Sequence, residues 1–146
     1  MITERSRFKN QEGFQLAANL DLPDHDPIKA FAIYAHCFTC SKNLKTVIDL
    51  FHSLTEEGIA VFRFDFTGIG MSEGFFTDTD FDSNTRDVLS AADFLSASSR
   101  APKLLIGHSL GAAAVLKAAP QLESVKAVVT IAASFSPSHL GSLLNE

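Results

Sequence analysis

The chain has 146 residues, of which 46% are hydrophobic and 20% are charged, and this composition predicts one domain with its own core. The formal net charge is −5 and no run of basic residues occurs, which argues against nucleic acid or an anionic membrane as the main partner. The first residues are charged and no apolar stretch is long enough to span a bilayer, so we expect a cytoplasmic protein.

The first third of the chain predicts a hairpin followed by a buried strand. Residues 5–9 and 14–22 alternate between apolar and polar side chains and are separated by a short polar segment with a glycine, which indicates an antiparallel β-hairpin. Residues 23–27 are polar and contain two prolines, as expected for a loop. Residues 30–36 form a continuous apolar run, typical of a strand buried on both faces.

A helix, a strand and a glycine-rich loop are predicted next. Ser41 can cap a helix over residues 42–57, and Gly58 suits its C-terminal end. The apolar residues of this helix form one stripe: Leu44, Val47, Ile48, Phe51 and Leu54. Residues 59–66 predict a strand, and residues 67–74 predict a loop rich in glycine.

The remaining segments alternate between helix and strand. We expect a helix over residues 83–98, a strand over 103–107, a helix over 109–119 and a final buried strand over 126–133. The inward-facing residues of the first of these helices are Val88, Ala91, Ala92 and Leu95. This alternation predicts a single α/β domain over residues 1–146, with about six strands in a mostly parallel sheet and helices on both faces.

The sequence Gly-His-Ser-Leu-Gly stands between the strand over 103–107 and the alanine-rich helix, which is the context of a nucleophile elbow. We expect Ser109 to be the nucleophile, exposed on a sharp turn, with the backbone N–H of Leu110 as one oxyanion donor. Gly107 and Gly111 let the strand and the helix pass closely. His108 sets the packing of the turn and is not expected to act as a base.

Several motifs together resemble the α/β-hydrolase superfamily, closest to its serine aminopeptidase and monoglyceride-lipase-like branch. They are the opening hairpin, the loop that begins at His36, the segment 63–74, and the pentapeptide around Ser109. The resemblance implies that this chain is the N-terminal part of such a fold. It also implies hydrolysis of an ester, thioester or amide bond of a small-molecule acyl substrate, through an acyl-enzyme on Ser109.

The loop after the third expected strand carries a more specific resemblance. Residues 35–42 are similar to the hydrolase half of bacterial bifunctional proteins with a C-terminal OsmC-like domain. In this family the second oxyanion donor comes from the same loop, which implies the N–H of Phe38, with Cys37 as the next candidate and His36 as a supporting residue. Cys37 stands where the superfamily usually has glycine.

The rest of the expected catalytic machinery is not found after Ser109. The resemblance places an acid and a histidine after later strands. The only carboxylate residues after Ser109 in this sequence are Glu123 and Glu146, and the only histidine is His139. Glu123 is expected at the wrong end of the sheet, and His139 comes too early in the chain. We therefore expect an incomplete domain whose last strand, over 127–133, is an uncovered edge open to self-association or to another partner.

Other functions remain open for the same residues. Cys37 and Cys40 form a C-x-x-C motif at the start of the expected helix, which is the spacing of a thiol redox pair. These cysteines could bind zinc together with His36 and His52, although structural zinc sites usually draw on a second paired cluster. A catalytically silent module that acts in binding or assembly is a further alternative. No metal or organic cofactor is implied by the hydrolase interpretation.

The glycines of the loop over 67–74 have a spacing one residue off the dinucleotide-binding motif, so we interpret this segment as a tight loop capped by Ser72 and Glu73. Asp65 is expected to fix this loop by hydrogen bonds. Asp87 and Asp93 are expected to face solvent on the helix over 83–98.

Overall fold

The computed structural model describes residues 1–37 and 41–133. These residues form a six-stranded sheet with the strand order β1-β2-β4-β3-β5-β6. In chain order the elements are β1 (Ile2–Lys9), β2 (Gln15–Leu22), β3 (Ala30–Ala35), α1 (Lys45–Glu56), β4 (Ile59–Phe64), η1 (Phe76–Asp78), α2 (Phe81–Ala97), β5 (Leu104–His108), α3 (Leu110–Ala118), η2 (Ala119–Gln121) and β6 (Ala127–Ile131).

The sheet combines an antiparallel hairpin with four parallel strands. β1 pairs antiparallel with β2, and β2 pairs antiparallel with β4. β3 runs parallel to both β4 and β5, and β5 runs parallel to β6. The prediction of a mostly parallel α/β sheet opened by a hairpin is confirmed. The carboxyl ends of β3, β4, β5 and β6 consequently meet at one edge, which is where such sheets usually carry their functional loops.

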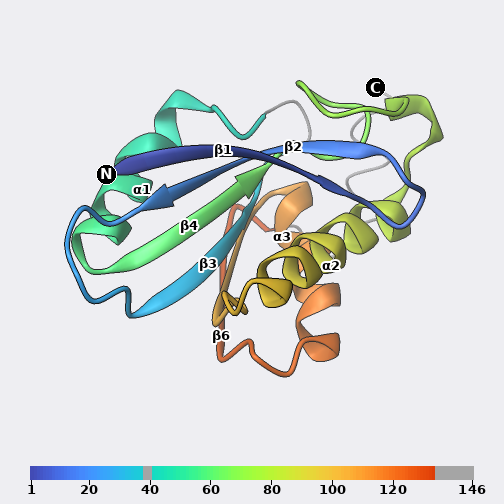
Figure 1. The fold of residues 1–146 in the computed structure, drawn as a ribbon. Coiled ribbons are helices and arrows are strands. Elements are labelled where there is room, and N and C mark those ends of the chain that lie inside the picture. Colours follow the sequence, from blue (N-terminus) through green and yellow to red (C-terminus); the bar gives the residue numbers. More distant parts are fainter. Residues whose placement is uncertain (38–40, 134–146) are drawn as a thin grey trace.

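Helices cover both faces of the sheet, as Figure 1 shows, with α1 on one side and α2 and α3 next to each other on the other. The α2–α3 side holds the larger core, which includes Phe8, Phe62 and Phe64. On the α1 side, Tyr34 packs edge-on against Phe51, with 5.0 Å between the ring centroids. Burial of these large apolar side chains is the main favourable term in the folding of the domain.

Helix α1 begins later than the sequence predicts. Its first residue is Lys45 and its N-cap residue is Leu44, which makes no capping hydrogen bond with its side chain. The predicted start at residue 42 with Ser41 as the cap is wrong, because Lys42 is held outside the helix by contacts described below. The predicted apolar stripe does pack on the sheet, and Gly58 ends the helix with a φ of +86°.

Helix α2 begins at Phe81, two residues before the predicted start, because Asp80 and Ser83 form a capping box. The prediction that Asp87 faces solvent is wrong, since this carboxylate is fully buried. It accepts hydrogen bonds from the Thr67 N–H at 2.9 Å, from Thr67 Oγ1 at 2.8 Å and from Asn10 Nδ2 at 3.4 Å. Burial raises the pKa of Asp87, and these hydrogen bonds oppose that change.

Strand β6 is exposed, contrary to the prediction of a buried final strand. It is the last strand in the sheet order, so one of its long sides has no neighbouring strand within the described residues. Val129 is 46% exposed and Ile131 is 36% exposed. The expected apolar sheet edge is therefore present at β6. Among the described residues, no helix has the length and apolar character needed to cross a membrane.

Candidate active site

Ser109 lies on a sharp turn at the edge where the parallel strands end. It follows the last residue of β5 and precedes the first residue of α3, with φ +55° and ψ −111°. Such a backbone conformation is strained for a residue other than glycine, and strain of this kind is concentrated at functional sites. The turn is held on both sides, because the Ser109 N–H donates to the Ile131 carbonyl and the Ser109 carbonyl accepts from the Ala112 N–H. The residue itself is partly exposed.

The two glycines of the motif allow the backbone segments to approach closely. A Cβ atom on Gly107 would lie 2.5 Å from the Ala112 Cα. A Cβ atom on Gly111 would lie 2.1 Å from the Ala35 carbonyl oxygen and 2.6 Å from the His36 carbonyl oxygen. No side chain fits at either position unless the backbone moves. The close approach also brings the end of β3 next to the first turn of α3.

One of the two expected oxyanion donors lies in the described structure. Leu110 is the first residue of α3, and N–H groups in the first turn of a helix have no acceptor within that helix. The N-terminal end of a helix also carries a partial positive charge that favours an anion. Phe38, the other expected donor, lies outside the described residues.

His36 connects the end of β3 to the segment after β4. Its side chain is fully buried, and Nε2 accepts a hydrogen bond from the Phe66 N–H at 3.2 Å. Because Nε2 is the acceptor, Nδ1 carries the proton and donates to the Cys37 carbonyl at 2.7 Å. Burial lowers the pKa of His36, while the Cys37 carbonyl and the charge of Asp65 act in the opposite direction. The neutral ring thus orients the first peptide of the loop that carries Phe38.

Acidification should destabilise the fold through His36. Its folded pKa lies below the usual value of 6.5, so the unfolded chain binds the proton more readily than the folded one. The contribution of His36 is fully present above pH 6.5 and is lost as the pH falls through the folded pKa. Urea unfolding between neutral and acidic pH should show a smaller fall in His36→Gln than in the original chain. Equal pH dependence in the two proteins would contradict this assignment.

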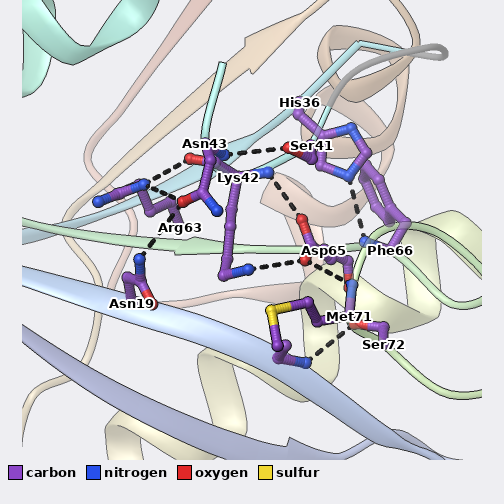
Figure 2. A network of polar contacts seen from close by, with 11 residues as sticks. Asn19, His36, Ser41, Lys42, Asn43, Arg63, Asp65, Phe66, Met71 and Ser72 are labelled. Carbon is purple, nitrogen blue, oxygen red and sulfur yellow. Dashed lines mark hydrogen bonds and ion pairs between the residues drawn. The ribbon is translucent and has the colours of Figure 1, made fainter. Parts of the chain in front are cut away.

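The far end of the same loop is fixed by a buried polar network, drawn in Figure 2. Asp65 accepts from the Lys42 N–H at 2.7 Å, from Lys42 Nζ at 2.8 Å and from the Met71 N–H at 3.1 Å. Arg63 Nη1 donates to the Lys42 carbonyl at 2.7 Å and to Asn43 Oδ1 at 2.9 Å. Asp65 therefore fixes the loop after β4, as the sequence predicts, and the loop after β3 as well.

A second buried ion pair connects this network to β2. Arg63 Nε donates to Asp21 Oδ2 at 2.7 Å, and Arg63 Nη2 donates to Asp21 Oδ1 at 3.2 Å. Asp21 is fully buried, and Thr3 Oγ1 donates to it at 2.7 Å. The paired roles of Arg63, Asp21 and Lys42 were not predicted from the sequence. The available signal was one arginine within the apolar strand over 59–66, since a buried charge requires a partner.

The other sequence candidates are not brought to Ser109. Glu123 is exposed in the connection before β6, at the edge of the sheet opposite Ser109. His139 and Glu146 lie outside the described residues. His108 lies next to Ser109, and its buried Nδ1 has no hydrogen-bond partner within residues 1–37 and 41–133.

The described residues place neither a pair of cysteine thiols nor a metal site. Cys37 is disulfide-bonded, and Cys40 lies outside the described residues. Over the described part of the chain, no group of three or more histidine, cysteine or acidic residues is arranged to hold a metal ion.

Comparison with known proteins shows which family this chain belongs to. A family model described as serine aminopeptidase, S33, matches residues 34–145. The crystal structure of the esterase domain from a Rhodothermus marinus protein is 48% identical, with a TM-score of 0.78, and the match covers 97% of this chain and 54% of that one. A comparison with curated proteins finds no match.

Two further solved structures are similar over most of this chain. An α/β serine hydrolase without a lid from Xanthomonas campestris is 29% identical, with a TM-score of 0.80, and the match covers 92% of this chain and 65% of that one. Est1E from Butyrivibrio proteoclasticus, whose structure has ferulic acid bound, is 28% identical, with a TM-score of 0.76 and coverage of 84% and 51%. This chain spans between half and two thirds of the length of these relatives. The chain belongs to the serine aminopeptidase S33 family of α/β-hydrolases.

Proposed function

We propose that this domain hydrolyses an ester, thioester or amide bond of a small molecule through an acyl-enzyme on Ser109. The observation that carries the proposal is the strained, partly exposed turn that places Ser109 between β5 and α3. The similarity to an esterase domain and to an α/β serine hydrolase supports the same reaction class.

In the proposed reaction, Ser109 Oγ attacks the substrate carbonyl carbon, and the electron pair of the carbonyl moves onto its oxygen. The Leu110 N–H, together with the Phe38 N–H, donates hydrogen bonds to this oxyanion. Loss of one such donor typically costs about 3 kcal/mol of transition-state stabilisation. The leaving group departs with a proton and leaves the acyl group on Ser109, and water then releases the acid.

A base must accept the Ser109 proton, and an acid must orient that base. We propose that both come from polypeptide that completes the domain, because this chain spans about half the length of relatives such as the esterase domain. The similarity of residues 35–42 to bifunctional hydrolases leads us to propose that the complete protein also carries an OsmC-like domain and lies in the cytoplasm. The genomic sequence after codon 146 tests this: an open frame with a downstream aspartate and histidine is expected, and a stop codon would contradict it.

A second candidate is a catalytically silent module that acts in assembly. The observation that favours it is the exposed apolar edge at β6. An unpaired strand presents free N–H and C=O groups on which another strand can form. We propose that this edge is covered by a further strand, from a second copy or from another polypeptide.

A fluorophosphonate probe distinguishes the two candidates. The folded protein is first separated by gel filtration into monomeric and associated fractions, and each fraction is then labelled. Because the base is proposed to lie in polypeptide outside this chain, the probe is applied to the complete protein, where labelling is expected and should be lost in Ser109→Ala. Ser53→Ala, which changes an exposed serine on α1, serves as the matched control and should keep the label. Folded protein that takes up no label in any fraction would support the silent module.

A further inference from the structure

A polar cavity lies on the α1 side of the sheet, away from Ser109. It has a volume of about 230 Å³, and its lining includes Arg5, Arg7, Asn19, Lys42, Asn43 and Met71. Arg5 and Arg7 are alternate residues of β1 and therefore project from the same face of the sheet. Asn19 of β2 is the register partner of Arg5 on β1 and of Arg63 on β4. These residues therefore lie on the face of the sheet that α1 covers.

The cationic groups around this cavity fall into two classes. Lys42 and Arg63 are buried and are paired with Asp65 and Asp21, respectively. Arg5 and Arg7 are exposed, and neither forms a salt bridge with a carboxylate of the described residues. The cavity thus carries two uncompensated guanidinium groups in a chain whose net charge is −5.

Asn43 contributes a neutral donor at the same place. Its Oδ1 accepts hydrogen bonds from Arg63 Nη1 at 2.9 Å and from Asn19 Nδ2 at 3.5 Å. The amide oxygen is thereby engaged, which leaves the Nδ2 hydrogens as donors. Figure 2 shows Asn43, Lys42, Asn19 and Met71 around the polar network beside which the cavity lies.

We propose that this cavity binds a small molecule through an oxyanion group, a phosphate or a carboxylate, with Arg5, Arg7 and Asn43 as its donors. A guanidinium group presents parallel N–H donors that match the oxygens of both anions. Charged side chains on the edge strand β1 also hinder its pairing with another chain. That role alone explains neither the concave site nor the amide donor of Asn43 beside the two arginines. The proposal is independent of the hydrolase chemistry, because none of these residues contacts Ser109.

Titration of the folded chain with inorganic phosphate, followed by NMR chemical shifts, tests the site, and a parallel titration with acetate compares the two oxyanions. Saturable shifts centred on Arg5, Arg7 and Asn43 are expected. Arg5→Gln and Arg7→Gln should each weaken the phosphate affinity by about tenfold, the usual effect of losing one charge-assisted contact. Lys103→Gln removes an exposed positive charge outside the cavity and should leave the affinity unchanged.

The proposal is overturned if the double variant Arg5→Gln/Arg7→Gln binds phosphate as the original chain does. It is also overturned if sodium chloride at equal ionic strength gives the same shifts, because this would show general screening. Saturation by acetate but not by phosphate would identify a carboxylate site, and the reverse result would identify a phosphate site. Labelling of Ser109 by the fluorophosphonate probe should be the same in these variants, so failure of this proposal would not affect the proposed function.

Discussion

Gly111→Ala is expected to lower the free energy of unfolding by about 3 kcal/mol, because the new methyl group has no space that side-chain motion could create. A Cβ atom at this position would lie 2.1 Å from the Ala35 carbonyl oxygen and 2.5 Å from the Ala35 carbonyl carbon. Both are backbone atoms of a central strand. Relief of the clash requires α3 to move away from β3, and this movement would also disturb the turn at Ser109.

Gly13→Ala is the matched control for this substitution. Gly13 has a φ of +88°, and no heavy atom lies within 4 Å of a Cβ built on it. The added methyl group there costs only backbone strain, roughly 1–2 kcal/mol. Urea unfolding followed by circular dichroism measures both variants. A loss for Gly111→Ala no greater than that for Gly13→Ala would show that the close approach of α3 to β3 is not needed for stability.

The positions of the helices and strands follow from local sequence patterns. Each of these elements is specified by residues that are close together in the chain. Examples are the alternation in the hairpin, the apolar runs of β3 and β4, and the glycines around Ser109. These elements could be predicted because the spacing of apolar and small residues along the chain indicates them.

The polar network could not be predicted in the same way, because its partners are far apart in the chain. Arg63 and Asp21 are separated by 42 positions, and Lys42 and Asp65 by 23. The pairing depends on which strands become neighbours, and β4 lies between β2 and β3 in the sheet. The late start of α1 has the same origin, since Lys42 is held by Asp65 and Arg63 and cannot join the helix.

The error at Asp87 has a different cause. Asp87 lies one residue before Val88 and four residues before Ala91, so the helical period places it on the inward face of α2. Its charge alone suggested exposure. The hydrogen bonds from Thr67 and Asn10 make burial tolerable, and both donors come from loops whose positions the sequence does not reveal.

Arg63→Met should produce the largest loss of stability, about 3–5 kcal/mol, because it leaves the carboxylate of Asp21 buried without a counter-charge. The Lys42 carbonyl and Asn43 Oδ1 also lose their arginine donor. Arg100→Met serves as the control, since the Arg100 guanidinium lies over the ring of Phe31 and forms no salt bridge within residues 1–37 and 41–133, and it should cost less than about 1 kcal/mol. A similar loss in the two variants would contradict a special role for the buried pair.

The double variant Arg63→Met/Asp21→Leu separates the charge pair from the anchoring of the loop. When both charges are removed, no unpaired carboxylate remains, so much of the lost stability should return, as measured in a double-mutant cycle by urea unfolding. The Lys42 carbonyl nevertheless still lacks the donor that Arg63 Nη1 supplies at 2.7 Å. Hydrogen exchange at the Lys42 amide should therefore remain faster than in the original chain, even where global stability is regained. Restoration of both quantities together would show that Asp65 alone holds the loop after β3, and that Arg63 acts only through its ion pair with Asp21.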